Sequence, residues 1–260
     1  MPVSRLRAKP LTLAKSGDLI AERDPLRPGG RLLRQGDMDA SYVDLADPLH
    51  LEFGYLRWIR IVLRAARARR VVHVGGGACA LARALAAEDP GGRQEVCEID
   101  AGVLALAREH LGLRRAPGLR VRVADGRAFL AGQRSATWDA VVVDAFEAAT
   151  VPHRLITAQA LADVARVAPL ALVNVLDNRA ARDLRTIGAG LATAYPRVWA
   201  LGVRAGNTVL ANAVAELDLD RIAAQAAADV SPARLTRPAA MTLLLAGTPS
   251  LRDEDVPSEA

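Results

Sequence analysis

The sequence predicts an α/β fold in which helices cover both faces of a doubly wound, mostly parallel sheet. Two observations carry this prediction. From residue 70 onward, short runs rich in β-branched residues alternate with segments that have helical spacing, which predicts βαβ units and a parallel sheet. The chain also has 260 residues, of which 51% are hydrophobic, so it can bury the core of one large domain with a small appendage.

The N-terminal residues 1–46 predict a small, separate β region. Their β-like runs are bounded by glycine and polar residues, and Ser16-Gly17 predicts a turn between the first two runs. These runs are residues 11–13, 18–20, 31–34 and 41–43. A helix is expected next, with Asp47 as its N-cap and Pro48 at its first position. Its apolar face includes Leu51, Tyr55, Trp58, Ile59 and Val62.

The main sheet follows in order along the chain. The expected strands are residues 71–74, 95–99, 119–123, 140–143 and 170–176, and the expected helices are 81–87, 103–111, 127–130, 158–167 and 179–194. Residues 198–203 and 208–213 then flank a turn at 204–207, which predicts a closing antiparallel hairpin. Two further helices are expected near 219–228 and 241–245. We therefore divide the chain into a β region (1–46), a larger α/β domain (47–247) and a flexible tail (248–260).

Composition excludes several classes of protein. The net charge is +5, but arginine supplies nearly all of the positive charge, and only 3% of residues are aromatic. A nucleic-acid-binding surface is therefore not expected, because it would combine basic residues with aromatic side chains for stacking. No apolar run is long enough for a signal peptide or a membrane span, and the chain has two cysteines. We expect a cytoplasmic protein without a membrane partner or a metal site.

Glycine or acidic residues follow four of the expected strands. Gly75, Gly76 and Gly77 follow the first strand, Glu98 ends the second, Asp125 and Gly126 follow the third, and Asp144 follows the fourth. Ligands of an open parallel sheet bind beyond the carboxyl ends of its strands. The glycines would let a nucleotide approach the backbone, and a carboxylate after the second strand can accept hydrogen bonds from both ribose hydroxyls. These residues are therefore the candidate site.

Each acid also has a structural interpretation. Asp100 directly precedes a helix, so we assign it to the N-cap and Glu98 to the ribose. For Asp125, capping of the next helix and a hydrogen bond from an adenine amino group both stay open. Asp144 emerges from a buried strand, where an unpaired carboxylate is costly and favours a cationic ligand. A nicotinamide enzyme has less need of the acids after the third and fourth strands, Asp125 and Asp144, so the pattern favours a sulfonium nucleoside.

The motifs at these strand ends resemble those of spermidine synthases and spermidine-synthase-like proteins. The similarity covers residues 35–212 and includes the motifs VVHVGGG (71–77), VCEID (96–100), VADG (123–126) and WDAVVVD (138–144), with SYVD (41–44) and LEF (51–53) before the sheet. The resemblance implies a seven-stranded methyltransferase-like sheet, decarboxylated S-adenosylmethionine as co-substrate and a small amine as acceptor. It implies that Glu98 contacts the ribose, that Asp125 contacts the adenine, and that Asp144 holds and deprotonates the amine. By the same analogy the N-terminal β region is a candidate homodimer contact.

The sequence departs from the family pattern at several positions. Ala78 stands where the family has an aspartate after the glycines, and Ala40 stands where it has a glutamine. The family has a second acid in the loop after Asp144, and Glu147 could replace it here, so by this resemblance we assign Glu147 to catalysis with Asp144. His153 is a candidate pocket residue, although a loop histidine without a role in the site is the more ordinary interpretation.

Three functions stay open at this stage. The first is transfer of an aminopropyl group to an amine, which the resemblance and the acids at 144 and 147 favour. The second is methyl transfer from ordinary S-adenosylmethionine, because Ala78 removes an acid and leaves room for the carboxylate of that nucleoside. The third is a non-catalytic nucleoside-binding relative, which the substituted positions favour.

Overall fold

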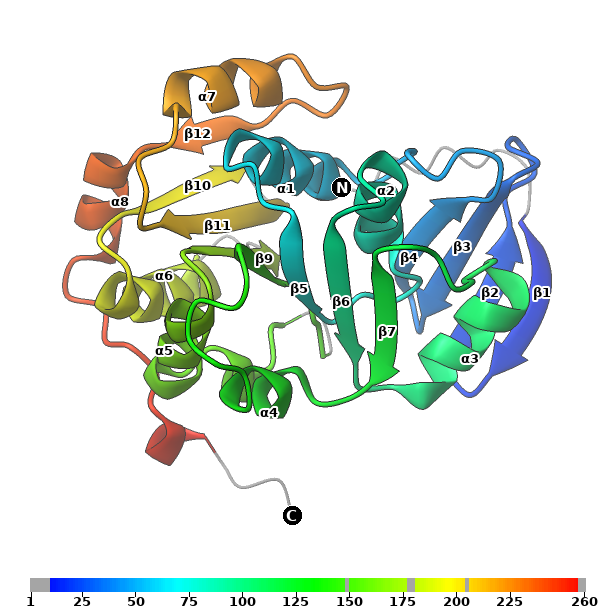
Figure 1. The fold of residues 1–260 in the computed structure, drawn as a ribbon, viewed down its shortest axis with the longest axis horizontal. Helices are drawn as coiled ribbons and strands as arrows, with labels where there is room; N and C mark the ends of the chain where they lie inside the picture. The colour runs from blue at the N-terminus through cyan, green and yellow to red at the C-terminus, as the bar shows by residue number, and fades with distance from the viewer. Residues whose placement is uncertain (1–9, 148–149, 177–180, 204–205, 257–260) are drawn as a thin grey trace.

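The computed structural model describes residues 10–147, 150–176, 181–203 and 206–256, which contain two sheets (Figure 1). The smaller sheet is antiparallel and has the strand order β1-β2-β3-β4. Its strands are β1 (Leu11–Ser16), β2 (Leu19–Arg23), β3 (Gly30–Gln35) and β4 (Met38–Asp44). This sheet lies beside α3 at one end of the molecule, so the predicted N-terminal β region is confirmed (Figure 1).

The larger sheet has eight strands in the order β12-β10-β11-β9-β8-β5-β6-β7. Its strands are β5 (Arg70–Val74), β6 (Arg93–Glu98), β7 (Leu119–Val123), β8 (Ala140–Val143), β9 (Leu170–Leu176), β10 (Val198–Gly202), β11 (Asn207–Ala213) and β12 (Arg234–Thr236). The five strands from β9 to β7 are mutually parallel, and β11, β10 and β12 continue the sheet in antiparallel pairs. The predicted α/β fold and its closing antiparallel pair are confirmed.

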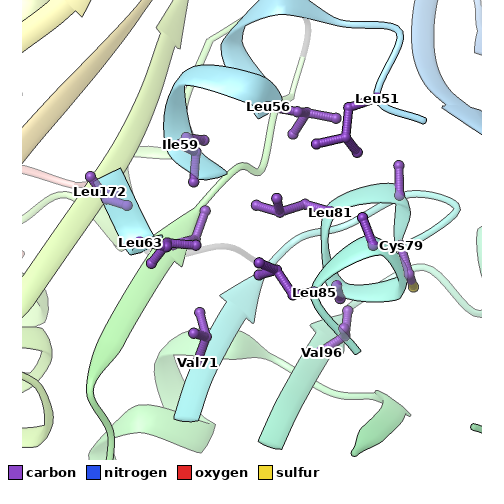
Figure 2. Packing of buried hydrophobic residues seen from close by; sticks show 14 of the residues in the cluster. Leu51, Leu56, Ile59, Leu63, Val71, Cys79, Leu81, Leu85, Val96 and Leu172 are labelled. Carbon is purple, nitrogen blue, oxygen red and sulfur yellow. The ribbon is translucent and has the colours of Figure 1, made fainter. Parts of the chain in front are cut away.

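Two hydrophobic clusters cover the two faces of this sheet. The helices are α1 (Gly54–Ala65), α2 (Ala80–Glu88), α3 (Ala101–His110), α4 (Gly126–Ala131), α5 (Ala158–Val167), α6 (Arg182–Ala194), α7 (Leu219–Ala227) and α8 (Pro238–Leu245). Helices α1, α2, α3 and α7 contribute to one cluster, and α4, α5, α6 and α8 contribute to the other. Figure 2 shows leucines of α1 and α2 meeting over β5 and β6. Both faces are therefore buried, as a parallel sheet requires.

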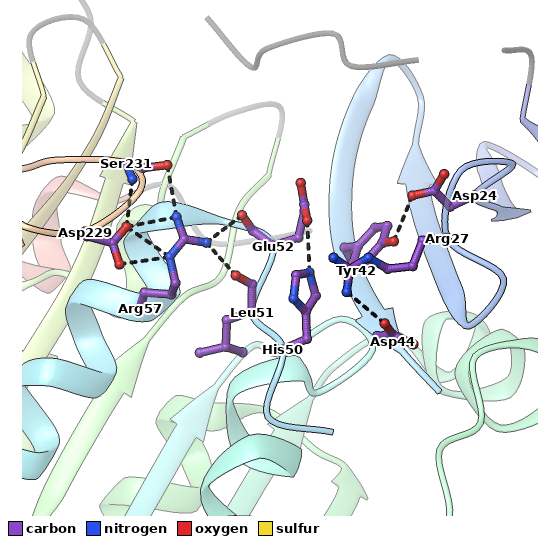
Figure 3. Close-up of polar contacts among 10 residues, drawn as sticks. All are labelled: Asp24, Arg27, Tyr42, Asp44, His50, Leu51, Glu52, Arg57, Asp229 and Ser231. Carbon is purple, nitrogen blue, oxygen red and sulfur yellow. Dashed lines mark hydrogen bonds and ion pairs between the residues drawn. The ribbon is translucent and has the colours of Figure 1, made fainter. Parts of the chain in front are cut away.

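The first helix begins later than the sequence predicted. Asp47 does not cap a helix; its carboxylate accepts a hydrogen bond of 3.0 Å from the Leu49 N–H, and α1 begins at Gly54. The guanidinium of Arg57 donates to the carbonyls of Leu51 and Glu52 and also pairs with Asp229, as Figure 3 shows. These contacts hold the segment before α1 outside the helix and connect it to the loop after α7.

One further expectation differs from the structure, and two others are covered only in part by the described residues. The sheet has an eighth strand, β12, because a three-residue segment with little pattern of its own pairs with the edge of β10. Helix α6 begins at Arg182, and residues 179–180 of its expected range lie outside the described residues, as do residues 204–205 of the expected turn. The first part of the expected tail, up to Asp253, is hydrogen-bonded to α5 and ion-paired with Arg127 of α4.

The expected domain boundary between the N-terminal β region (1–46) and the rest of the chain stays a prediction. In the part of the chain that the structure describes, no helix has both the length and the apolar character that crossing a bilayer requires.

Candidate functional site

The glycine turn after β5 lies where three strands meet. Gly75 and Gly77 have φ angles of +76° and +50°, a region that favours glycine. A Cβ atom on Gly75 would clash with the carbonyl oxygen of Asp144, and one on Gly77 would lie 2.9 Å from the Cβ of Ser41 on β4. The turn therefore packs tightly between the end of β8 and the N-terminal sheet. Gly76 lines the same pocket as its two neighbours.

Glu98 ends β6 directly beside this turn. It is 8% exposed, and its carboxylate accepts hydrogen bonds from the backbone N–H groups of Gly77, at 3.2 Å, and Asp100, at 3.0 Å. Glu98 therefore holds the shape of the glycine turn, and its contact with a ribose stays a prediction. The predicted cap is confirmed, because the Asp100 carboxylate accepts from the N–H groups of Gly102 and Val103 at the start of α3.

Asp125 has structural partners of its own. Its carboxylate accepts a hydrogen bond of 2.9 Å from the Ala128 N–H and so caps α4, and its other oxygen pairs with Arg154. The capping interpretation is thus confirmed, and the contact with adenine stays a prediction. Gly126 lets α4 approach the sheet, because a Cβ atom there would clash with Val74 of β5.

Asp144 is held at the end of β8 by two neutral donors. Its Oδ1 atom accepts a hydrogen bond of 2.8 Å from Asn174 Nδ2, and its Oδ2 atom accepts one of 3.0 Å from the hydroxyl of Tyr55. Protein atoms surround the carboxyl, and this burial raises the pKa of Asp144 above its ordinary value, with a further contribution from the charge of Glu98. The two hydrogen bonds act in the opposite direction, because they stabilise the ionised form.

Sequence reasoning missed the partners of Asp144. Tyr55 was assigned only to the apolar face of a helix, although burial raises the pKa of its phenol and keeps it a neutral donor. Asn174 is fully buried in β9. A polar residue inside an otherwise apolar strand was the available signal for Asn174, since a buried amide requires hydrogen-bond partners.

A pocket opens between the glycine turn, α1 and Asp144. It measures about 530 Å³ together with its open mouth. Its lining includes Ala40 and Ser41 of β4, Tyr55 and Leu56 of α1, the three glycines, the first residues of α2, Asp144 and Phe146. Two other titratable groups line it. Burial lowers the pKa of His73 to about 4 and raises that of the Cys79 thiol to about 12. At neutral pH the charge in the described lining therefore belongs to Asp144.

Some of the other expected residues lie away from this pocket. Glu147 is exposed and outside the lining, and its backbone forms a small bridge with Thr150. His153 is exposed at the start of the short 3₁₀ helix η1 (His153–Leu155) and is also outside the lining. Ala78 is fully buried in the hydrophobic core. The catalytic assignment of Glu147 stays a prediction.

Two apolar side chains are exposed at the same edge of the sheet. Ile99 follows Glu98 and is 55% exposed, and Val123 ends β7 and is 52% exposed. Val123 lies opposite Glu98 in the β6–β7 register. Exposed apolar residues at the carboxyl end of parallel strands offer a flat surface for an apolar ring.

Within the described ranges, no three His, Cys, Asp or Glu side chains are grouped to hold a metal ion.

No protein-family model matches this chain, and no curated protein sequence matches it significantly. Solved structures do match. A probable spermidine synthase from Corynebacterium glutamicum ATCC 13032 is 26% identical, with a TM-score of 0.84 over 93% of this chain and 95% of that one. A spermidine synthase from Thermotoga maritima is 13% identical, with a TM-score of 0.62 over 91% of this chain and 84% of that one.

Two further solved structures carry nucleoside ligands. A spermidine synthase in complex with the transition state analogue AdoDATO is 13% identical, with a TM-score of 0.64 over 91% of this chain and 85% of that one. Human methyltransferase-like protein 13 in complex with SAH is 17% identical, with a TM-score of 0.52 over 65% of this chain and 85% of that one. The chain thus has the methyltransferase-like α/β fold and is spermidine-synthase-like in structure over nearly its whole length.

Proposed function

We propose that this protein is a transferase that binds a nucleoside sulfonium and moves an aminopropyl group from decarboxylated S-adenosylmethionine to a small-molecule amine. The observation that carries this proposal is the environment of Asp144. Its carboxylate lies in the pocket at the end of β8, with Tyr55 and Asn174 as its described side-chain partners. Both partners are neutral, so the partly buried carboxylate lacks a cation among these contacts. A positively charged substrate would supply the missing charge.

The nucleoside half of the donor would lie along the carboxyl ends of β5, β6 and β7. We assign the ribose hydroxyls to Glu98, whose oxygens keep acceptor capacity beyond their two backbone hydrogen bonds. Ile99 and Val123 would contact the faces of the adenine, and Asp125 would accept from its amino group. The glycine turn at residues 75–77 and Gly126 would lie beside the sugar. The solved spermidine synthase with AdoDATO and the methyltransferase with SAH support a nucleoside of this class.

The reaction at this site is an in-line displacement. The lone pair of the acceptor amine attacks the carbon next to the sulfonium sulfur, a C–N bond forms, and the C–S bond breaks. The bonding pair stays on sulfur, which becomes a neutral thioether. The nitrogen loses one proton, which Asp144 accepts or passes to water. Such a step depends mainly on alignment of the two reactants and on an unprotonated amine, both of which a fixed carboxylate promotes.

Glu147 would act at the edge of the site. It is exposed in the loop after Asp144, next to Phe146, which lines the pocket. An exposed carboxylate there attracts a cationic amine through solvent, and this attraction is weak and sensitive to salt. We therefore propose that Asp144 holds the reacting nitrogen and that Glu147 assists capture of the amine.

One observation favours methyl transfer from ordinary S-adenosylmethionine as a second candidate function. Helix α2 begins at the pocket, and its N-cap residue Cys79 makes no side-chain capping hydrogen bond. Uncapped N–H groups at a helix N-terminus attract anions, and the neighbouring Ala78 adds no negative charge. The carboxylate that distinguishes S-adenosylmethionine from its decarboxylated form would suit this position.

Calorimetric titration with the two nucleosides, followed by turnover assays with small amines, tests the proposal. Tighter binding of the decarboxylated form and release of methylthioadenosine with an amine are expected. Tighter binding of S-adenosylmethionine would instead favour methyl transfer. Binding of either nucleoside without turnover of any amine would favour the non-catalytic alternative. The homodimer contact through β1–β4 stays a prediction, which sedimentation analysis would test.

A further inference from the structure

We propose that Asn174 and Asn207 are positioning residues, which form a relay of two amides that holds the carboxylate of Asp144 in one orientation. This inference rests on the function proposed above. In the relay, Asn207 Nδ2 donates a hydrogen bond of 3.1 Å to Asn174 Oδ1, and Asn174 Nδ2 donates one of 2.8 Å to Asp144 Oδ1. The relay therefore joins β8, β9 and β11 at the edge of the sheet that carries the pocket.

The order of donors in the relay follows from charge. An ionised carboxylate only accepts hydrogen bonds, so Asn174 must turn its NH₂ group toward Asp144. Its carbonyl oxygen then points away and needs a donor, because Asn174 is fully buried. Asn207 supplies that donor. Rotating the amide of Asn174 by half a turn would place two oxygens against each other at one end and two NH₂ groups at the other. The relay thus has one favourable arrangement.

The sheet register places the two amides together. Asn207 is the first residue of β11 and pairs with Leu176, while Asn174 pairs with Val209 in the same antiparallel ladder. Asn207 and Val209 are two positions apart on β11, so their side chains lie on the same face of the sheet. Because Val209 is paired with Asn174, the two asparagines are diagonal neighbours on that face. On the other side of the carboxylate, Tyr55 donates from α1. Asp144 is therefore fixed between a helix and a strand, and both of its oxygens have a donor.

The relay bears on the ionisation of Asp144. Among the described residues, the titratable groups that face this carboxyl are Tyr55 of α1, Glu98 of β6, His73 of β5 and Cys79 at the start of α2. Tyr55, His73 and Cys79 are neutral at neutral pH, while Glu98 and burial both raise the pKa of Asp144. The hydrogen bond from Asn174 opposes these effects. Its loss would leave a larger fraction of Asp144 protonated and unable to hold an amine.

Asn212 provides a matched control. It is fully buried, as Asn174 is, and lies on β11, as Asn207 does, but neither atom of its side-chain amide has a hydrogen-bond partner. Asn207 and Asn212 are five positions apart on one strand, so their side chains lie on opposite faces of the sheet. A change at Asn212 perturbs the same sheet without touching the relay.

The first measurement is the titration of the Asp144 carboxyl carbon by NMR in the ligand-free protein, with Asp144→Asn identifying the signal. Asn174→Ala is expected to lower the acid dissociation constant of Asp144 roughly tenfold. Asn207→Ala should change it in the same direction by less, and it serves as the test if Asn174→Ala does not fold. Asn174→Gln, which keeps an amide donor, should restore part of the shift, and Asn212→Ala should leave the constant unchanged.

The second measurement is the pH profile of turnover. For Asn174→Ala the acidic limb of kcat/KM should move to higher pH and kcat should fall at least tenfold, with the KM for the nucleoside unchanged. An unchanged Asp144 titration in both Asn174→Ala and Asn207→Ala would overturn the relay. Absence of turnover in the unmodified protein would overturn the proposed function instead, and the NMR titration would still decide on the relay.

Discussion

The hydroxyl of Tyr55 donates a hydrogen bond of 3.0 Å to Asp144 Oδ2 across 89 positions of sequence. This contact ties α1, the first helix after the smaller sheet, to the end of strand β8 in the larger sheet. Burial keeps the pKa of the phenol above its ordinary value, so Tyr55 acts as a neutral donor at physiological pH. The pocket acid is therefore held by a helix that the sequence assigned only to the core.

Asp144→Asn is expected to lower turnover by roughly a hundredfold to ten-thousandfold, because the amide cannot accept a proton or pair with an ammonium group. Binding of the nucleoside should change little, because we propose that its ribose and adenine contact other strand ends. Steady-state kinetics and calorimetry measure the two effects. Unchanged turnover would exclude Asp144 from the chemistry. Glu147→Gln is the comparison variant, and it should raise the KM for the amine a few-fold at low salt and less at high salt.

Asp144→Asn should also stabilise the fold at neutral pH. The pKa of Asp144 is raised, so between its unfolded and folded pKa values the native state binds a proton that the unfolded state has lost. The contribution of the Asp144 carboxyl to the free energy of unfolding therefore falls as pH rises through that window, and it does not recover at higher pH. Asp144→Asn removes this loss, and its free energy of unfolding in urea at pH 7 should exceed that of the unmodified protein. The difference should shrink toward low pH.

Glu98→Gln should weaken nucleoside binding at least tenfold. The variant replaces one acceptor oxygen by an NH₂ group, which faces the backbone N–H of Gly77 or Asp100 and distorts the glycine turn. Asp100→Asn is the matched control, because asparagine is an equally good N-cap and keeps α3 in place. Calorimetric titration compares the two variants. Equal binding in Glu98→Gln and the unmodified protein, or an equal loss in Asp100→Asn, would contradict a specific role of Glu98 in nucleoside binding.

His73 should make the fold sensitive to acid. Its ring is buried and donates to Gln94 Oε1, and burial lowers its pKa from 6.5 to about 4. Between these values the unfolded state binds a proton that the native state excludes, so stability is lost as pH falls from 6.5 to 4. The loss amounts to about 3 kcal/mol. Urea unfolding at pH 7 and pH 4.5 should show a smaller loss for His73→Gln, and an equal loss would contradict this origin.

Asn212→Leu is expected to stabilise the protein by roughly 1 to 2 kcal/mol. The side-chain amide of Asn212 is fully buried without a hydrogen-bond partner, and leucine has a similar size and no polar group to desolvate. Thermal and urea unfolding measure the change. A loss of stability in Asn212→Leu would show that the site does not accept the branched side chain.

The order of strands and helices could be predicted from the sequence because it depends on local patterns. Apolar runs of strand length and helical spacing recur along the chain, and a capping residue such as Asp100 acts on its immediate neighbours. The acids at the strand ends were visible for the same reason, since parallel strands bring their carboxyl ends to one edge. Contacts between distant residues were not visible. The start of α1 depends on Arg57 and its pairing with Asp229, 172 positions away.

The sequence by itself determined the parallel sheet, the glycine turn and the acids at its edge, because hydrophobic periodicity and turn-forming residues act over a few positions. The tertiary structure alone decided which groups hold those acids. Tyr55, Asn174 and Asn207 meet Asp144 only when α1, β9 and β11 are packed together, and Arg154 meets Asp125 only when η1 lies against α4. Hydrogen bonds of this kind depend on distance and direction in space, which no spacing along the chain specifies.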